Sequence, residues 1–215
     1  MINYDNAVFN GINKVVYMTY ASALWFLFSL PVVTIGASTT ALYYTIYKVV
    51  RNETGKVFEE FLRSFKSNFK QSTIVYAVFA AIVSVGLVDC FVLKMYLENG
   101  MLFKVSICIV LLLVIGTAMA AGYAFPYIAR FENTTKLILI NTIYILITHF
   151  IKSIGLLFIF VAAFLLVLIN PVFLAFSPGL YMFCASYIIE PIFRKYMTAE
   201  DLEEEQKKYE IRSDI

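Results

Sequence analysis

The chain has 215 residues, of which 61% are hydrophobic and 15% charged, and its formal net charge is +2. This hydrophobic share exceeds the roughly 45–50% of an ordinary soluble domain. Several apolar runs approach the roughly 18–20 residues that cross a bilayer, and they lack the alternation of a membrane β-barrel. The near-neutral charge gives no reason to expect nucleic acid as a partner. We therefore expect an all-α, polytopic membrane helix bundle that forms one domain over residues 1–197.

The first expected span covers residues 15–35 and ends in a hinge motif. Proline removes a backbone donor and glycine permits a sharp redirection of the chain, so an incoming helix should kink or stop here. We expect Ser38 or Thr39 to cap a second helix over 39–51, which is too short to cross and should pack at the inner membrane interface. The hinge motif consists of Pro31, Thr34, Gly36, Ser38 and Thr39.

An amphipathic helix is expected over residues 56–70, because apolar residues recur there at intervals of three and four. The apolar face consists of Phe58, Phe61, Leu62, Phe65 and Phe69. A helix of this kind lies in the headgroup plane of a bilayer, which is the favoured interpretation, or docks a cytoplasmic partner protein.

Lysine and arginine predict the layout of the rest, because cytoplasmic loops attract both residues. They concentrate between Lys48 and Lys70 and again after Phe193, so these two segments should share a side. The prediction is five spans, with the N-terminus outside and the C-terminus in the cytoplasm. The later elements are spans at 73–97, 101–127, 152–170 and 178–196, a boundary helix at 136–150 and a cytoplasmic helical tail at 198–215. Whether 136–150 itself crosses is left open.

No arrangement of residues suggests catalysis. The chain has one histidine, His149, and three cysteines that lie apart in apolar runs, so neither a metal site nor a cofactor is expected. We therefore predict a protein that is not an enzyme.

Five polar residues near or within the apolar runs are candidates for a functional or structural role: Asp89, Asn141, Arg130, Glu132 and Glu190. Asp89 is the most notable, because a carboxylate inside a bilayer normally faces protein or water. It either bonds to a neighbouring helix, which is favoured, or contacts a proton or substrate. Asn141 is expected to bond across helices. Glu190 and Arg194 are four residues apart and are expected to pair.

Three stretches resemble the YesL-like family of bacterial multi-pass membrane proteins, a domain of unknown function found mainly in Firmicutes. They are Leu30–Ala37 with Thr40–Tyr44, Phe61–Phe69 and Ala129–Asn133. Members of that family are often encoded beside carbohydrate ABC-transporter components and sensor kinases for sugar use, so the resemblance implies a link to these proteins, and it supplies no catalytic residue.

These observations predict an accessory membrane protein that contacts the bilayer and either subunits of an ABC sugar transporter or a sensor kinase. A homo-oligomer is also compatible with the sequence. The alternative is a small transporter or channel that uses Asp89 and the broken helix at Pro31–Ser38. Convergence of Asp89, Asn141 and Arg130 on a wet cavity would favour transport, and their dispersal into helix contacts would favour the accessory role.

Overall fold

The computed structural model describes residues 4–96, 100–198 and 202–203, and the regular elements among these residues are all helical. In chain order they are α1 (Tyr4–Ser29), η1 (Val32–Thr34), α2 (Ile35–Thr45), η2 (Ile46–Arg51), α3 (Val57–Tyr96), α4 (Met101–Arg130), α5 (Thr135–Thr148), α6 (Phe150–Ile169), η3 (Pro171–Ala175) and α7 (Ser177–Phe193). The helix bundle expected from composition is confirmed. The tail expected at 198–215 lies almost wholly outside the described residues.

The turn between α1 and α2 contains the break expected at Pro31. The α1 helix ends at Ser29, and the Thr34 hydroxyl lies 2.5 Å from the carbonyl oxygen of Phe28 and 2.6 Å from that of Pro31. Phe28 lies in the last turn of α1, whose carbonyls have no partner within the helix, and the Pro31 carbonyl also accepts from the Thr34 backbone N–H at 2.7 Å. The next helix already begins at Ile35, so the expected cap at Ser38 or Thr39 is wrong.

The helix expected over 39–51 begins earlier, at Ile35, and continues into η2, and α2 lies at the centre of the bundle. Eight of its 11 residues are buried, and small or hydroxyl-bearing residues are among them. A Cβ on Gly36 would lie 2.6 Å from the carbonyl oxygen of Ser72 and 2.7 Å from the Cβ of Tyr76. One turn along, the hydroxyls of Thr40 and Ser72 are 2.8 Å apart. These short side chains let α2 approach α3 closely.

The amphipathic segment and the second expected span form one continuous helix, α3. Neither glycine nor proline interrupts residues 57–85, so the helix continues where a boundary was expected near residue 70. Part of the apolar face in the first half of α3 packs inside the protein. Phe61 is fully buried, and Phe28 of α1 packs against Phe61 and Phe65 with ring centroids 5.5 and 5.0 Å apart. Phe58 and Phe69 remain exposed.

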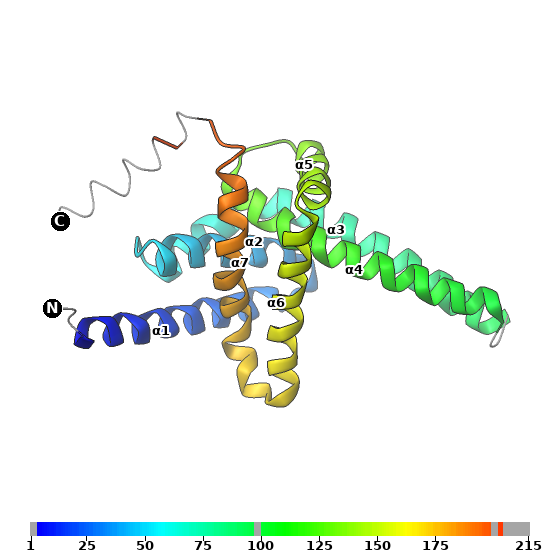
Figure 1. The fold of residues 1–215 in the computed structure, drawn as a ribbon, viewed down its shortest axis with the longest axis horizontal. Coiled ribbons are helices and arrows are strands. Elements are labelled where there is room, and N and C mark those ends of the chain that lie inside the picture. Colours follow the sequence, from blue (N-terminus) through cyan, green and yellow to red (C-terminus); the bar gives the residue numbers. More distant parts are fainter. Residues whose placement is uncertain (1–3, 97–99, 199–201, 204–215) are drawn as a thin grey trace.

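Two helical hairpins extend from the body in different directions (Figure 1). The α3–α4 pair runs sideways, whereas the α6–α7 pair runs downward from the body. Within the described residues, three helices are long and apolar enough to cross a membrane, and they are α3, α4 and α6. The spans expected at 15–35 and 178–196 are not among them. Pro31 and the polar residues of α1 interrupt the first, and the 17 residues of α7 reach only about 26 Å.

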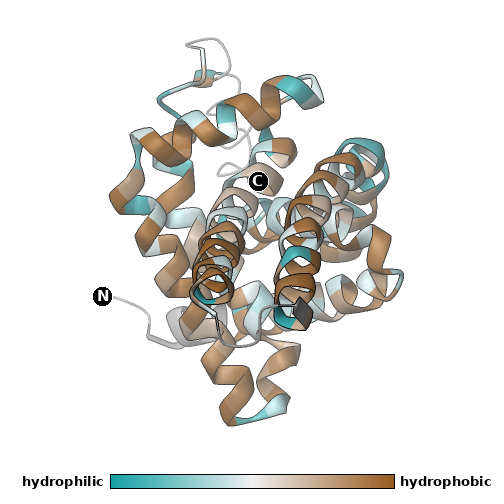
Figure 2. Ribbon diagram, turned by 90° about the vertical axis from the view of Figure 1, so that its right-hand side faces the viewer, coloured by the Kyte–Doolittle hydropathy of each residue, from teal (hydrophilic) through white to brown (hydrophobic). Residues whose placement is uncertain are grey.

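The exposed surface of both hairpins is largely apolar. Figure 2 shows the α6–α7 hairpin, at the bottom of the molecule, as mostly hydrophobic, with a short hydrophilic stretch at its closed end. Ile169 and Val172 at this end are 77% and 76% exposed. The sequence contains no charged residue between Lys152 and Glu190, nor between Lys14 and Lys48. The helices α1 and α2 pack against each other as a third hairpin within the body, and charges therefore gather at the open ends of this hairpin and of α6–α7.

Candidate functional site

The candidate site begins with the last turn of the central helix, which widens into a π-helix. In η2 the backbone N–H of Asn52 donates to the carbonyl oxygen of Tyr47, five residues earlier, at 3.2 Å. The backbone N–H and hydroxyl of Thr54 close the turn on the carbonyl oxygen of Lys48, at 3.0 and 2.8 Å. Widened turns of this kind are frequent at functional sites.

A buried carboxylate lies beside this turn. Glu190 of α7 is 1% exposed and accepts a hydrogen bond of 2.7 Å from the Tyr43 hydroxyl on α2. Its other oxygen lies 3.2 Å from Nη2 of Arg130, the last residue of α4. The Arg130 guanidinium lies over the ring of Tyr47, 4.4 Å from the ring centroid. Burial, and then the negative charge of Glu190, raise the pKa of Tyr43 well above its ordinary value, so this hydroxyl stays protonated and donates.

A second arginine joins the same turn to α7. Arg51 Nη1 donates to the carbonyl oxygen of Ser186 at 2.7 Å and to its hydroxyl at 3.2 Å. The Arg51 guanidinium also lies 4.3 Å from the ring centroid of Tyr187. We refer to Tyr43, Tyr47, Arg51, Arg130 and Glu190 together as the buried ionic cluster. It joins the ends of α2, α4 and α7.

A smaller group of charges lies on the other side of η2. Glu60 of α3 is 8% exposed and lies 2.9 Å from the Lys48 ammonium nitrogen, and it also pairs with Arg63. The Tyr44 hydroxyl accepts from Arg63 at 3.2 Å and from Lys48 at 3.4 Å. These contacts join the start of α3 to the end of α2, so α3 too is held at this end of the bundle.

The arrangement neutralises charge inside the protein. A buried ion pair requires close geometry and further hydrogen bonds to offset the loss of hydration, and Glu190 has both. In the part of the chain that the structure describes, no three His, Cys, Asp or Glu side chains lie close enough to hold a metal ion. The contacts of the cluster hold the ends of α2, α4 and α7 together electrostatically.

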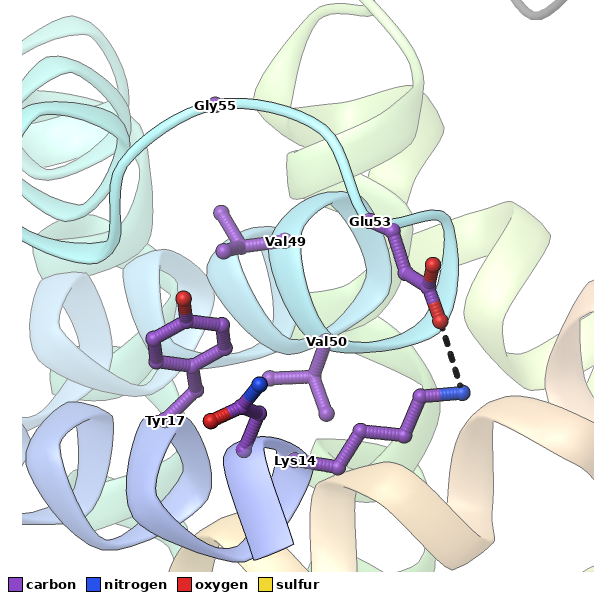
Figure 3. A pocket seen from close by; sticks show the side chains of 7 residues that line it. Lys14, Tyr17, Val49, Val50, Glu53 and Gly55 are labelled. Carbon is purple, nitrogen blue, oxygen red and sulfur yellow. Dashed lines mark ion pairs between the residues drawn. The ribbon is translucent and has the colours of Figure 1, made fainter. Parts of the chain in front are cut away.

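A pocket of about 220 Å³ opens between α1 and the loop after η2 (Figure 3). The polar side chains of Asn13, Lys14 and Tyr17 border it from α1. Lys14 and Glu53 form an ion pair of 3.0 Å beside it, between side chains that are 36% and 62% exposed. This contact places the start of α1 next to the segment that the charge rule assigns to the cytoplasm. It argues against the expected layout, in which the two lie on opposite sides.

The polar residues singled out from the sequence separate into different contacts. Asp89, towards the closed end of the α3–α4 hairpin, accepts a hydrogen bond of 3.1 Å from Ser106. The Asn141 amide donates to the Tyr127 hydroxyl at 2.8 Å, across helices as expected. Glu132 is exposed in the connector before α5. Only Arg130 and Glu190 meet, and the expected pairing of Glu190 with Arg194 is replaced by this contact.

The sequence reasoning missed several members of the two clusters, namely Tyr43, Tyr47, Lys48, Arg51, Glu60 and Arg63. A signal was present, since three tyrosines and two cations lie within the nine residues Tyr43–Arg51, in a helix that was interpreted from its apolar face alone. Their partners Arg130 and Glu190 are far away in sequence, and only the fold brings them together.

The comparisons with known proteins agree with the resemblance seen in the sequence. Residues 18–90 match the model of a family described as "Protein of unknown function, DUF624". No curated protein and no solved structure matches the chain. The matched segment runs from α1 to α3 and contains the hinge, the central helix and the π-helical turn. Residues 18–90 are therefore a DUF624 region, consistent with membership of a YesL-like family whose function is unknown.

Proposed function

We propose that this chain is a non-enzymatic accessory protein of the bacterial plasma membrane that docks another membrane protein on its cytoplasmic side. The proposed partner is a carbohydrate ABC transporter subunit or a sugar-sensing kinase. This partner class rests on the YesL-like resemblance alone. The membrane location rests on the long apolar helices α3, α4 and α6.

The observation that carries the accessory role is the separation of the polar residues. Asp89 bonds to Ser106, Asn141 to Tyr127, and Arg130 to Glu190, so each serves a different helix contact. A transport pathway would need such groups to face a common wet cavity. The proposal therefore assigns them to holding the bundle together.

The proposed docking surface is the polar face at the start of α3. The exposed side chains there are Glu59, Lys66 and Lys70, and they lie beside the partly buried apolar face of α3. The anchoring of Glu60 to Lys48 fixes this helix end to the centre of the protein. A fixed helix presents its side chains without the entropic cost of ordering them on binding.

The proposed orientation has both described chain ends in the cytoplasm. An antiparallel hairpin returns the chain to the side from which it started, and the Lys14–Glu53 pair supports this arrangement for α1 and α2. The α3–α4 and α6–α7 hairpins support it for the rest (Figure 1). In this orientation the bilayer normal lies between the directions of these two hairpins. Both closed ends then lie on the side of the membrane opposite the cytoplasm.

Site-specific photo-crosslinking in native membranes tests the docking surface. A photoreactive residue at Lys66 should give crosslinks to a transporter subunit or a kinase. The matched control is the same residue at Lys104, which is also exposed but lies near the closed end of the α3–α4 hairpin. Crosslinks only between copies of this chain, or equal partner yields at both positions, would contradict the proposal.

A further inference from the structure

The junction of α5, α6 and the end of α7 forms a second surface with a distinct character. The ring of Tyr196, just after α7, lies 6.2 Å from the ring of Tyr144 on α5 and 6.2 Å from that of His149, between α5 and α6. Tyr144 and Tyr196 are 56% and 42% exposed. These ring contacts bring Lys195, the neighbour of Tyr196, close to the first turn of α6, which carries Lys152.

The charge on this surface is positive. Lys152 and Lys195 are exposed, and neither forms an ion pair within the described residues. Burial of the ring, and then the positive charges of Lys152 and, more weakly, Lys195, lower the pKa of His149. The sequence has no Asp or Glu between Glu132 and Glu190, and Glu190 is buried against Arg130.

The surface also lies where a bilayer would meet it. The adjoining Phe150 and Ile151 are 56% and 85% exposed, and they begin α6, one of the helices apolar enough to cross a membrane. Tyrosines are enriched at the headgroup level, and lysines beside a span attract anionic headgroups.

We propose that Lys152 and Lys195, framed by Tyr144 and Tyr196, bind the phosphate of an anionic phospholipid headgroup such as phosphatidylglycerol. The lipid's acyl chains then lie along the exposed apolar side of α6. This site is separate from the docking surface on α3, and it does not depend on the proposed accessory role.

Native mass spectrometry of the full chain in detergent, titrated with phosphatidylglycerol or with phosphatidylcholine, tests the proposal. The wild type should bind phosphatidylglycerol more tightly than phosphatidylcholine. The double variant Lys152→Gln/Lys195→Gln should lose affinity for phosphatidylglycerol by about fivefold for each lysine. The matched control, Lys94→Gln/Lys104→Gln, removes two exposed lysines near the closed end of the α3–α4 hairpin and should retain the affinity.

Three results would overturn the proposal. The first is a wild type with no preference for phosphatidylglycerol. The second is an equal loss of affinity in the two double variants. The third is lipid binding that appears only after the chain is shortened at Thr198, which would assign this surface to the acidic segment 200–205 of the same chain. Thermal unfolding of each variant without lipid separates lost binding from lost folding.

Discussion

Replacing Arg130 by methionine should destabilise the protein strongly, because it leaves the Glu190 carboxylate buried without its cation. Glu190 is 1% exposed and the Arg130 side chain 13%, so solvent screens their interaction little. Removing one partner of a buried pair costs about 3–5 kcal/mol. For a chain of this size, each kcal/mol shifts the midpoint of thermal unfolding by about 2–4 °C. We therefore expect Arg130→Met to unfold about 10 °C below the wild type.

The assay is thermal unfolding in detergent, followed by loss of the monodisperse peak in size-exclusion chromatography. The control is Arg194→Met, which removes the exposed cation that the sequence pairs with Glu190 and should shift the midpoint by less than about 2 °C. The double variant Arg130→Met/Glu190→Met should unfold at a higher temperature than Arg130→Met, because the unpaired carboxylate is gone. Equal losses in Arg130→Met and Arg194→Met would refute the reasoning.

Three further outcomes follow from the packing and the hydrogen bonds. Gly36→Ala forces a Cβ to 2.6 Å from a carbonyl oxygen of α3 and should lower stability by about 1–3 kcal/mol. Gly116→Ala places a Cβ where nothing lies within 4 Å and should be neutral or stabilising. Equal midpoints of thermal unfolding in the two variants would contradict the close approach of α2 to α3. The pKa of Tyr43 is raised in the folded protein. The stability that its protonated hydroxyl supplies is therefore complete below the unfolded pKa of about 10 and is lost as the pH rises through the higher pKa of the folded state. Tyr43→Phe should therefore be less stable than the wild type at neutral pH and should lose less stability in alkali. Identical pH profiles of stability would mean that the Tyr43 hydroxyl does not stabilise the fold. Asp89→Asn keeps an acceptor for Ser106 and should change stability by less than about 1 kcal/mol, and a larger loss would mean that the Asp89 charge itself is required.

The central helix α2 shows where the sequence reasoning succeeded and where it failed. The break at Pro31 that separates it from α1 was predicted, because the effect of proline on a helix is local. Its burial was not, because Gly36 and Thr40 look like ordinary small residues until α3 packs against them. Composition could predict a membrane helix bundle, but it could not show which short helix lies at the centre.

The candidate site was predictable only in part. Arg130 and Glu190 were both noted as unusual polar residues, since a charge beside an apolar run is visible in the sequence. Their pairing was not predictable, because they lie in different helices and a nearer cation, Arg194, offers a plausible partner at helical spacing. Tyr43 was missed because a tyrosine in an apolar run resembles core until a buried carboxylate is found beside it.

The orientation of the hairpins is tested most directly by cysteine accessibility in a chain whose three native cysteines have been replaced. Single cysteines at Gly11, Lys66 and Lys195 sample the open ends of the three hairpins, and Lys104→Cys samples a closed end. A membrane-impermeant reagent applied to intact spheroplasts should label only the cysteine at position 104. Labelling at position 11 together with protection at position 66 would place the start of α1 across the bilayer from the start of α3 and contradict the account.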